Sequence, residues 1–212
     1  MNSNNILDNN LERTIRKVAD FYDIKKVGDT GPLGFRRTSD VSRLSASIDE
    51  LIGRDILVPG ESLFLDMGCG DGRVNVLFSY LAKISVGIEQ DEWTLDEYDP
   101  LKKGLESELK RYNLLLPSDN IFLFRGDSMD AKLHESIARK TGAGFEDFDL
   151  YYTYLTMYEE FADLIKRKGK KGAIFMIYGL DRIMPILDGF ELLTGDNPIQ
   201  GILAVYRKIN PI

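Results

Sequence analysis

The amino-acid sequence predicts a doubly wound α/β fold: a seven-stranded, mostly parallel sheet with an antiparallel last strand and helices on both faces. Two observations support this prediction. After residue 60, short apolar segments alternate with segments that have the periodicity of amphipathic helices, a pattern typical of parallel β-α units. The chain then ends in two apolar segments joined by a short Gly/Asp/Asn/Pro loop, as in an antiparallel hairpin.

The segment before the sheet, residues 1–58, is expected to form a helical extension and a flap ahead of the main domain over residues 59–212. Apolar residues at helical spacing predict one helix over 11–22 and another over 41–54. Between them, residues 28–40 are rich in glycine and predict an ordered loop, either a flap over a ligand or a plain connection.

The main domain shows the alternation segment by segment. Each strand is expected where four to eight apolar residues occur together, and each helix where apolar residues recur every three or four positions. The predicted strands cover 62–67, 84–89, 120–127, 149–155 and 171–179, followed by the hairpin over 190–209, and the predicted helices cover 73–83, 99–115, 130–142 and 157–169.

The composition disfavours several classes of function. The formal net charge is −7, whereas proteins that bind nucleic acid usually present a basic surface, so a nucleic-acid partner is not expected. A single cysteine excludes an internal disulfide framework and fits a reducing cytoplasm. No apolar run approaches the roughly 20 residues of a membrane span. One histidine and one cysteine also exclude a zinc site of the usual ligand types.

A glycine-rich segment follows the first predicted strand, where open parallel sheets bind ligands. It has an acid followed by glycines at alternate positions, in the order Asp66, Gly68, Gly70, Gly72. A dinucleotide fingerprint would need glycine in place of Arg73 or Asn75, and a phosphate-binding P-loop would need Gly-Lys-Ser/Thr. The acid would repel a pyrophosphate but suits a cationic ligand, such as one with an amine or a sulfonium.

This motif resembles motif I of the class I S-adenosylmethionine-dependent methyltransferases, and the resemblance extends over about residues 61–208. It implies the class I methyltransferase fold and S-adenosylmethionine as cofactor, with S-adenosylhomocysteine as product. It also implies that Asp66 faces the methionine portion and that the loop lines the cofactor through Met67, Gly68, Cys69, Gly70 and Gly72.

Two further strand ends match the same family. Glu89, followed by Gln90, ends the second strand, where the family has an acid that binds both ribose hydroxyls; one carboxylate has the two acceptor oxygens that a vicinal diol needs. Asp127 and Ser128 end the third strand, where the resemblance implies contact with the adenine amino group. Trp93, which follows soon after Glu89, is expected near the adenine; alternatively it fills the core.

The end of the fourth strand, where the family places residues that face the substrate, is less informative. The DNA enzymes that methylate amino groups have Asn/Asp-Pro-Pro-Tyr/Phe there, whereas residues 152–156 contain no proline, which disfavours an exocyclic base amine as acceptor. Tyr152 and Tyr154 are the candidate catalytic residues, because aromatic faces favour cations; alternatively they are core residues of a buried strand. The single histidine, His134, is expected on an exposed helix face.

The resemblance therefore implies an enzyme that transfers a methyl group in line to an unidentified acceptor. A likeness to small protein-lysine methyltransferases favours a protein lysine, and a small molecule is the rival acceptor. Two other functions stay open. One is a partner subunit that binds S-adenosylmethionine without catalysis. The other is an aminopropyl transferase, which is disfavoured because residues 151–156 lack the paired acids of that class.

Overall fold

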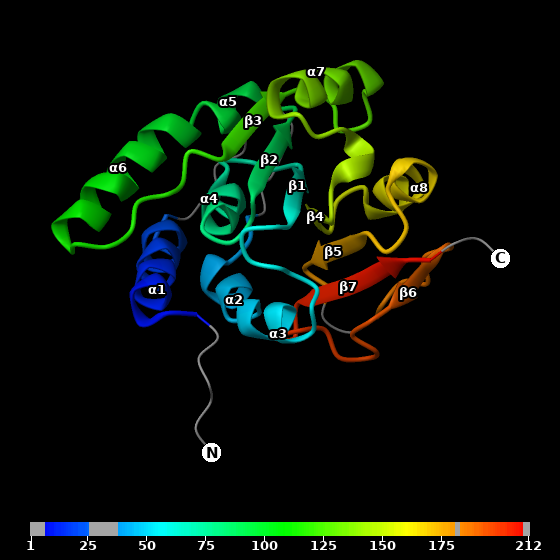
Figure 1. The fold of residues 1–212 in the computed structure, drawn as a ribbon, viewed down its shortest axis with the longest axis horizontal. Coiled ribbons are helices and arrows are strands. Elements are labelled where there is room, and N and C mark those ends of the chain that lie inside the picture. The colour runs from blue at the N-terminus through cyan, green and yellow to red at the C-terminus, as the bar shows by residue number, and fades with distance from the viewer. Residues whose placement is uncertain (1–6, 26–37, 181–182, 210–212) are drawn as a thin grey trace.

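The computed structural model describes residues 7–25, 38–180 and 183–209, and these contain a seven-stranded sheet of order β3-β2-β1-β4-β5-β7-β6 (Figure 1). The five strands β1 to β5 are parallel, and β7 runs antiparallel to both β5 and β6. The predicted fold class is confirmed. The strands are β1 (Leu63–Met67), β2 (Ile84–Glu89), β3 (Ile121–Arg125), β4 (Leu150–Tyr154), β5 (Ile174–Tyr178), β6 (Phe190–Leu192) and β7 (Leu203–Lys208).

The strand order creates a switch point between β1 and β4. From β1 the chain moves outward through β2 to β3, then returns to β4 and moves outward in the other direction. In a doubly wound sheet, ligands bind outside the carboxyl ends of the strands at such a point. Asp66 lies there in register with Gly87 on β2 and Tyr152 on β4, so the ends of all three strands meet.

Helices cover both faces of the sheet, because successive strand residues point to opposite faces and each face needs an apolar cover. One core lies between the sheet and α1 to α4 with α6; the other lies between the sheet and α7 with α8. The helices are α1 (Asn9–Asp23), α2 (Val41–Ser45), α3 (Ile48–Gly53), α4 (Arg73–Ser79), α5 (Glu92–Leu95), α6 (Tyr98–Arg111), α7 (Ala131–Thr141) and α8 (Tyr158–Lys168).

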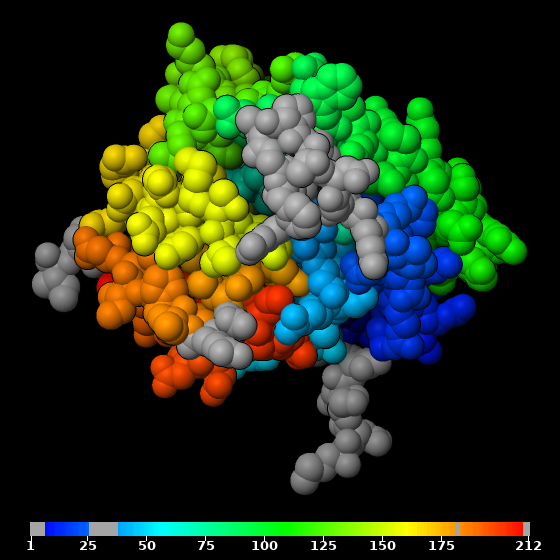
Figure 2. All heavy atoms as spheres, turned by 180° about the vertical axis from the view of Figure 1, so that it is seen from behind, coloured from blue at the N-terminus to red at the C-terminus, as the bar shows by residue number. Residues whose placement is uncertain are grey.

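The N-terminal helices differ from the prediction, since the single helix expected over 41–54 is divided into α2 and α3. The carboxylate of Asp23, at the end of α1, accepts hydrogen bonds from the backbone N–H groups of Val41 and Ser42 (2.8 and 2.9 Å). This pins the start of α2 to the end of α1. Seen from behind, α2 lies between α1 and the segment before β7 (Figure 2), where Arg43 donates to the Gln200 carbonyl (3.3 Å).

Helix α5 is a second difference from the predicted elements. It was not predicted, because four residues are too few to show a helical period; its start is capped by Asp91, which accepts from the Trp93 N–H (3.1 Å). Residues 26–37, most of the predicted flap, lie outside the described residues. Within the described ranges, no helix has the length and apolarity needed to cross a membrane.

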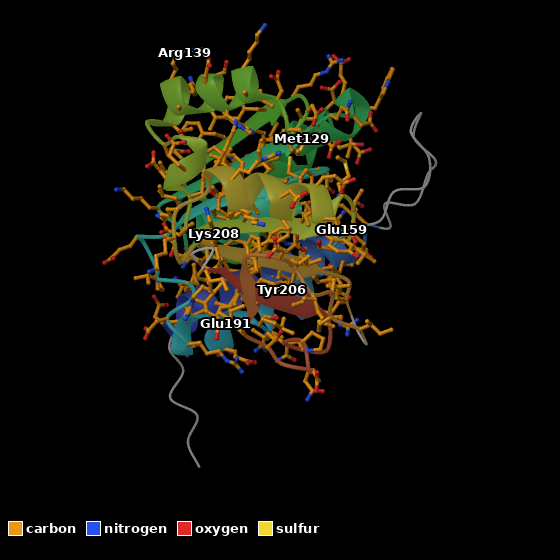
Figure 3. The ribbon with its side chains drawn as sticks, turned by 90° about the vertical axis from the view of Figure 1, so that its right-hand side faces the viewer. Met129, Arg139, Glu159, Glu191, Tyr206 and Lys208 are labelled. Carbon is orange, nitrogen blue, oxygen red and sulfur yellow. The ribbon has the colours of Figure 1, made fainter. Side chains whose placement is uncertain are left out.

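The antiparallel β7 brings a lysine to the edge where the parallel strands begin. In Figure 3, Lys208, at the end of β7, lies to the left of Glu159, which is in the first turn of α8. The buried amine of Lys208 donates to the Gly169 carbonyl, and burial lowers its pKa from 10.5. Lys208 therefore supports the edge of the sheet remote from the switch point.

Candidate functional site

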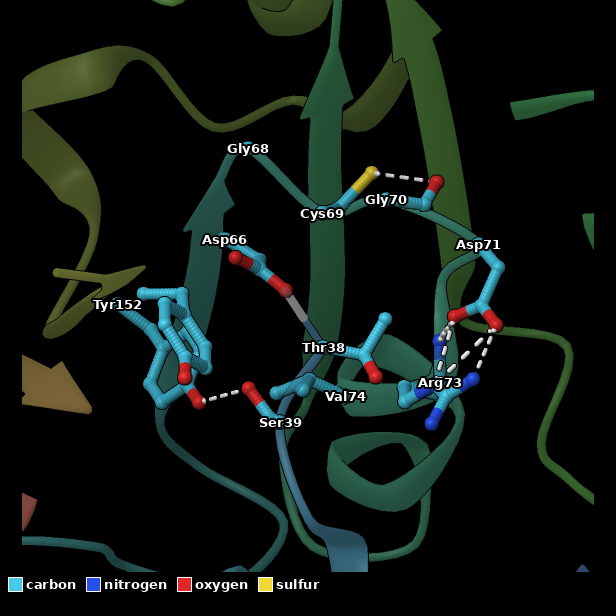
Figure 4. Close-up of a pocket in the computed structure, with 11 residues that line it drawn as sticks. Thr38, Ser39, Asp66, Gly68, Cys69, Gly70, Asp71, Arg73, Val74 and Tyr152 are labelled. Carbon is cyan, nitrogen blue, oxygen red and sulfur yellow. Dashed lines mark hydrogen bonds and ion pairs between the residues drawn. The ribbon is translucent and has the colours of Figure 1, made fainter. Parts of the chain in front are cut away.

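A cleft opens at the switch point, over the carboxyl ends of β1 and β4 (Figure 4). Its first part spans about 300 Å³ of space that is partly open to solvent, and it includes the glycine-rich loop. It is lined by Thr38, Ser39, Asp66, Gly68, Cys69, Gly70, Asp71, Arg73, Val74, Tyr152 and Tyr154. Both candidate catalytic tyrosines thus lie beside the predicted binding loop.

The second part of the cleft lies over the ends of β2 and β3 and spans about 440 Å³ of space that is partly open to solvent. Gly68 lines both parts, so they meet above it. The lining residues are Met67, Gly68, Ile88, Glu89, Gln90, Gly126, Asp127, Ser128, Thr156, Met157 and Phe161. The structure therefore brings every predicted cofactor-binding residue except Gly72 to these two adjoining parts of the cleft.

Asp66 is the most unusual group in the cleft. It is only 1% exposed, and its Oδ1 atom is buried and accepts no hydrogen bond. Burial, followed by the nearby carboxylates of Glu89 and Asp71, raises the pKa of Asp66 well above 3.8. A buried acid without a partner is costly, and a ligand group that donates hydrogen bonds and carries positive charge would relieve that cost.

The glycine loop combines a fixed backbone with free space. The N–H groups of Gly68 and Cys69 both donate to the Ile88 carbonyl (2.9 Å each), which ties the loop to β2. Gly68 has φ +93°, and a Cβ at this position would meet no atom within 4 Å, so its backbone faces open space. A ligand can therefore approach the Gly68 backbone closely.

Gly72, in contrast, does not line the cleft, and packing explains why it is glycine. Its φ is +74°, and a Cβ there would lie 2.8 Å from Tyr98 and 2.9 Å from Leu123. The residue thus allows α4 to begin close to α6 and β3. The alternating glycines serve two purposes, ligand approach at Gly68 and packing at Gly72.

Glu89 is fixed at the junction of the two parts of the cleft. Its Oε2 accepts from the Gly70 N–H (2.8 Å), and its Oε1 accepts from the Asp91 N–H (2.9 Å). An ionised carboxylate has about four acceptor sites, so both oxygens can still accept from a ligand. The side chain is therefore oriented by the backbone and can bind hydroxyl groups.

His134 is buried, and the prediction that it lies on an exposed helix face is wrong. Its Nε2 lies 2.9 Å from the carbonyl oxygen of Ser128, a residue of the cleft lining, and its ring packs at a tilt against Phe145, with the ring centroids 4.5 Å apart. The helical period alone could not assign this face, because α7 is covered by the segment around Phe145. His134 thus supports the loop beneath the second part of the cleft.

We expect His134 to make the protein less stable in mild acid. Burial lowers the pKa of His134 from 6.5. Its buried Nδ1 has no hydrogen-bond partner, so a proton added there would not be hydrogen-bonded. The unfolded chain therefore binds this proton more tightly, and the free energy of unfolding falls as the pH drops below 6.5, by at most about 1.4 kcal/mol per pH unit. Urea unfolding of the wild type and of His134→Gln should diverge below this pH; parallel profiles would contradict the assignment.

Tyr152 and Tyr154 have different environments. The ring of Tyr152 is buried and its hydroxyl lies 2.6 Å from the Ser39 hydroxyl, which supports its interpretation as a core residue. Tyr154 is half-buried, with its ring 5.4 Å from that of Tyr178. Tyr154 is therefore the tyrosine whose face can contact a ligand.

The backbone after Tyr154 is strained, which the sequence did not indicate. Leu155 and Met157 have φ values of 30° and 51°, in the region that side-chain-bearing residues rarely adopt. Such strain is maintained by surrounding structure and often marks ligand-binding segments. Met157 and its neighbour Thr156 line the second part of the cleft.

Two other features of the site were missed or differ from expectation. Thr38 and Ser39 enter the cleft from a segment far away in the sequence, and a tertiary contact of this kind leaves no local signal. Trp93 is 69% exposed and does not line the cleft. Burial raises the pKa of the Cys69 thiol, which disfavours the reactive thiolate. No cluster that could hold a metal ion occurs in the described ranges.

The fold can be compared with known proteins. No protein-family model matches the chain, and no curated protein matches it in sequence. Among solved structures, it is similar to an RNA methyltransferase from Salinibacter ruber in complex with S-adenosyl-L-homocysteine, with a TM-score of 0.52 and 17% identity over 84% of this chain and 96% of that one. It is also similar to the tRNA (m1A58) methyltransferase TrmI from Aquifex aeolicus, with a TM-score of 0.51 and 16% identity over 95% of this chain and 76% of that one.

Identities this low establish the architecture alone. The two likenesses cover 84% and 95% of this chain, whose own sheet has the doubly wound strand order with a reversed β7. The chain has the fold of the class I S-adenosylmethionine-dependent methyltransferases.

Proposed function

We propose that this protein is an S-adenosylmethionine-dependent methyltransferase whose cofactor binds in the cleft over β1, β2 and β4. The buried, unpartnered Oδ1 of Asp66 carries the proposal, because it calls for a cationic hydrogen-bond donor at the place where the fold binds ligands. The Salinibacter ruber enzyme of the same fold holds S-adenosyl-L-homocysteine, which supports this choice of ligand.

The residues of the cleft fit the parts of that cofactor. Asp66 would bind the amine, the Gly68 backbone would allow close approach, and Glu89 would accept from the ribose hydroxyls. Asp127 and Ser128 would bind the adenine end, next to apolar surface from Ile88, Met157 and Phe161. When bound, the cofactor supplies a methyl group on a sulfonium.

The protein's own contribution is positioning and exclusion of water. Methyl transfer is an in-line displacement, and a base is needed only if the acceptor atom must first lose a proton. The described lining contains no histidine, Asp71 is paired with Arg73, and Asp66, Glu89 and Asp127 would be occupied by the cofactor. The cleft therefore suits an acceptor with a free lone pair, such as a neutral amine nitrogen, presented against the ring of Tyr154.

The class of acceptor stays open among three. A protein lysine and a small molecule were favoured by the resemblance and by the net charge of −7. The two neighbours are an RNA and a tRNA methyltransferase, which weakens the argument against nucleic acid. A ring nitrogen of a structured RNA is also an acceptor with a free lone pair, so RNA joins the candidates.

Calorimetric titration of S-adenosylmethionine and S-adenosylhomocysteine tests the proposal. We expect the wild type to bind both in the micromolar range, and Glu89→Ala to weaken binding tenfold or more, about 1.4 kcal/mol. Glu92→Ala is the matched control. It removes the same charge three residues further along the chain, and the side chain of Glu92 is exposed and does not line the cleft. A folded wild type that binds neither ligand would refute the proposal.

The acceptor can be sought with the methyl-labelled cofactor. Label should pass to the protein, RNA or small-molecule fraction of a lysate, and the labelled fraction identifies the acceptor class. Tight binding without transfer to any fraction would instead favour the non-catalytic partner subunit.

A further inference from the structure

Arg73 is a buried cation in a cleft that is otherwise acidic. It is the first residue of α4 and is only 3% exposed. Among the described residues that line the two parts of the cleft, it is the only lysine or arginine, whereas Asp66, Asp71, Glu89 and Asp127 are acidic. Arginine side chains are usually exposed to solvent, so a buried one at a ligand site needs a structural or functional explanation.

The guanidinium is held in one orientation but is not saturated. Its Nε donates to both oxygens of Asp71 (3.0 and 3.1 Å), and Nη2 donates to Oδ2 (2.7 Å). Its face lies over the Tyr22 ring, 5.4 Å from the centroid. A guanidinium has five N–H donors, and Asp71 uses two of them. The other three donate to no described residue, so they are available to an anion.

The positions of the charges favour a zwitterion over a simple cation. Asp66 and the Asp71–Arg73 pair both line the first part of the cleft, on either side of Thr38 in Figure 4. A ligand carboxylate placed among these acids would be repelled unless it lay beside a cation. Arg73 is the lining group that can meet it, through charge-assisted hydrogen bonds.

We propose that Arg73 and Asp66 together select the amino-acid end of the ligand, with Arg73 binding the α-carboxylate and Asp66 the α-ammonium. This rests on the proposed function, and it assigns a binding role to a residue outside the glycine motif. The site then discriminates against S-adenosyl ligands that lack the carboxylate. Decarboxylated S-adenosylmethionine, which aminopropyl transferases use, is such a ligand.

The test compares two ligands that differ in one group. S-adenosylhomocysteine and its decarboxylated analogue share the adenosine, the thioether and the amine, so their affinity ratio reports on the carboxylate alone. By calorimetry, we expect the wild type to bind S-adenosylhomocysteine at least tenfold more tightly than the decarboxylated analogue.

Variants assign that preference to Arg73. Arg73→Gln alone would leave Asp71 buried without a counter-charge, so the double change Asp71→Asn/Arg73→Gln is made beside it. We expect the double variant to bind the two ligands within about threefold of each other. Arg43→Gln, which removes an exposed cation outside the cleft, should keep the wild-type ratio. Thermal unfolding confirms that each variant is folded.

The outcomes separate this inference from the proposed function. A wild type that binds neither ligand overturns the proposed function and the inference together. A wild type that binds both equally overturns the inference alone, as does a double variant that keeps the wild-type ratio. A preference for the decarboxylated analogue would overturn the inference and favour an aminopropyl transferase.

Discussion

Asp66→Asn is expected to abolish measurable binding of S-adenosylmethionine while making the free protein more stable at neutral pH. The carboxylate is buried beside Glu89 and Asp71, and its Oδ1 has no partner, so the free protein bears the cost of an unsatisfied acid. The neutral amide of the asparagine carries no buried negative charge, which favours the free protein, but it also gives the amine of the ligand no counter-charge. We expect a loss of affinity of at least a hundredfold, about 2.7 kcal/mol, and a gain in unfolding free energy on the order of 1 kcal/mol.

Rising pH is expected to lower the unfolding free energy of the wild type through Asp66. The pKa of Asp66 is raised in the folded protein above the ordinary 3.8, so the folded state holds this proton more tightly than the unfolded chain does. Stability therefore falls as the pH rises from 3.8 through the folded-state pKa, and Asp66→Asn lacks this decline. Urea unfolding from pH 4 to 8, at roughly one-unit steps, compares the two proteins.

Ligand binding should show the same linkage. Because a cationic ligand favours the ionised form of Asp66, binding at a pH below the folded-state pKa releases a proton, and affinity rises with pH over that range. Calorimetry in buffers of different ionisation enthalpy measures this release. Asp119→Asn, at an exposed position outside the cleft, is the control and should leave both binding and stability unchanged. An Asp66→Asn protein that bound like the wild type would contradict the role of this residue.

Gly72→Ala is expected to destabilise the protein by about 3 kcal/mol, a large part of the stability of an ordinary domain. Its φ of +74° is strained for alanine, and the new Cβ would lie 2.8 Å from Tyr98 and 2.9 Å from Leu123. Chemical denaturation measures the loss.

Gly60→Ala separates the two causes. Gly60 has nearly the same φ, +75°, but a Cβ there would meet no atom within 4 Å. It should therefore cost only the backbone strain, about 1 kcal/mol. If both substitutions cost the same, packing against α6 and β3 would not be the reason for glycine at position 72.

Much of the fold and of the candidate site could be predicted because the signals are local. The alternation of apolar strands with helical periods reports burial of successive residues within one element, and it predicted all seven strands. Asp66 and the glycines that follow it lie within one turn of the chain, so their spacing can be recognised in the local sequence. Since the carboxyl ends of parallel strands meet at one edge, the acids at the ends of β2 and β3 were predicted to lie beside it, and both line the cleft.

Contacts between distant segments were decided by the tertiary structure. Thr38 and Ser39 line the cleft because Ser39 meets Tyr152, which is 113 residues away in the sequence. His134 is buried because α7 packs beside Phe145, and Gly72 must be small because α6 and β3 come close to it.

Arg73 shows the difference most clearly. The sequence by itself determined that a basic residue follows the glycine loop at the start of a helix, a place where charged side chains are usually solvated. Only the tertiary structure buried it, because α1 lies over α4 and puts Tyr22 against the guanidinium face while Asp71 binds its edge. Periodicity records how each element meets the core, but the charge of a site depends on which elements enclose it, and that depends on packing between segments distant in sequence.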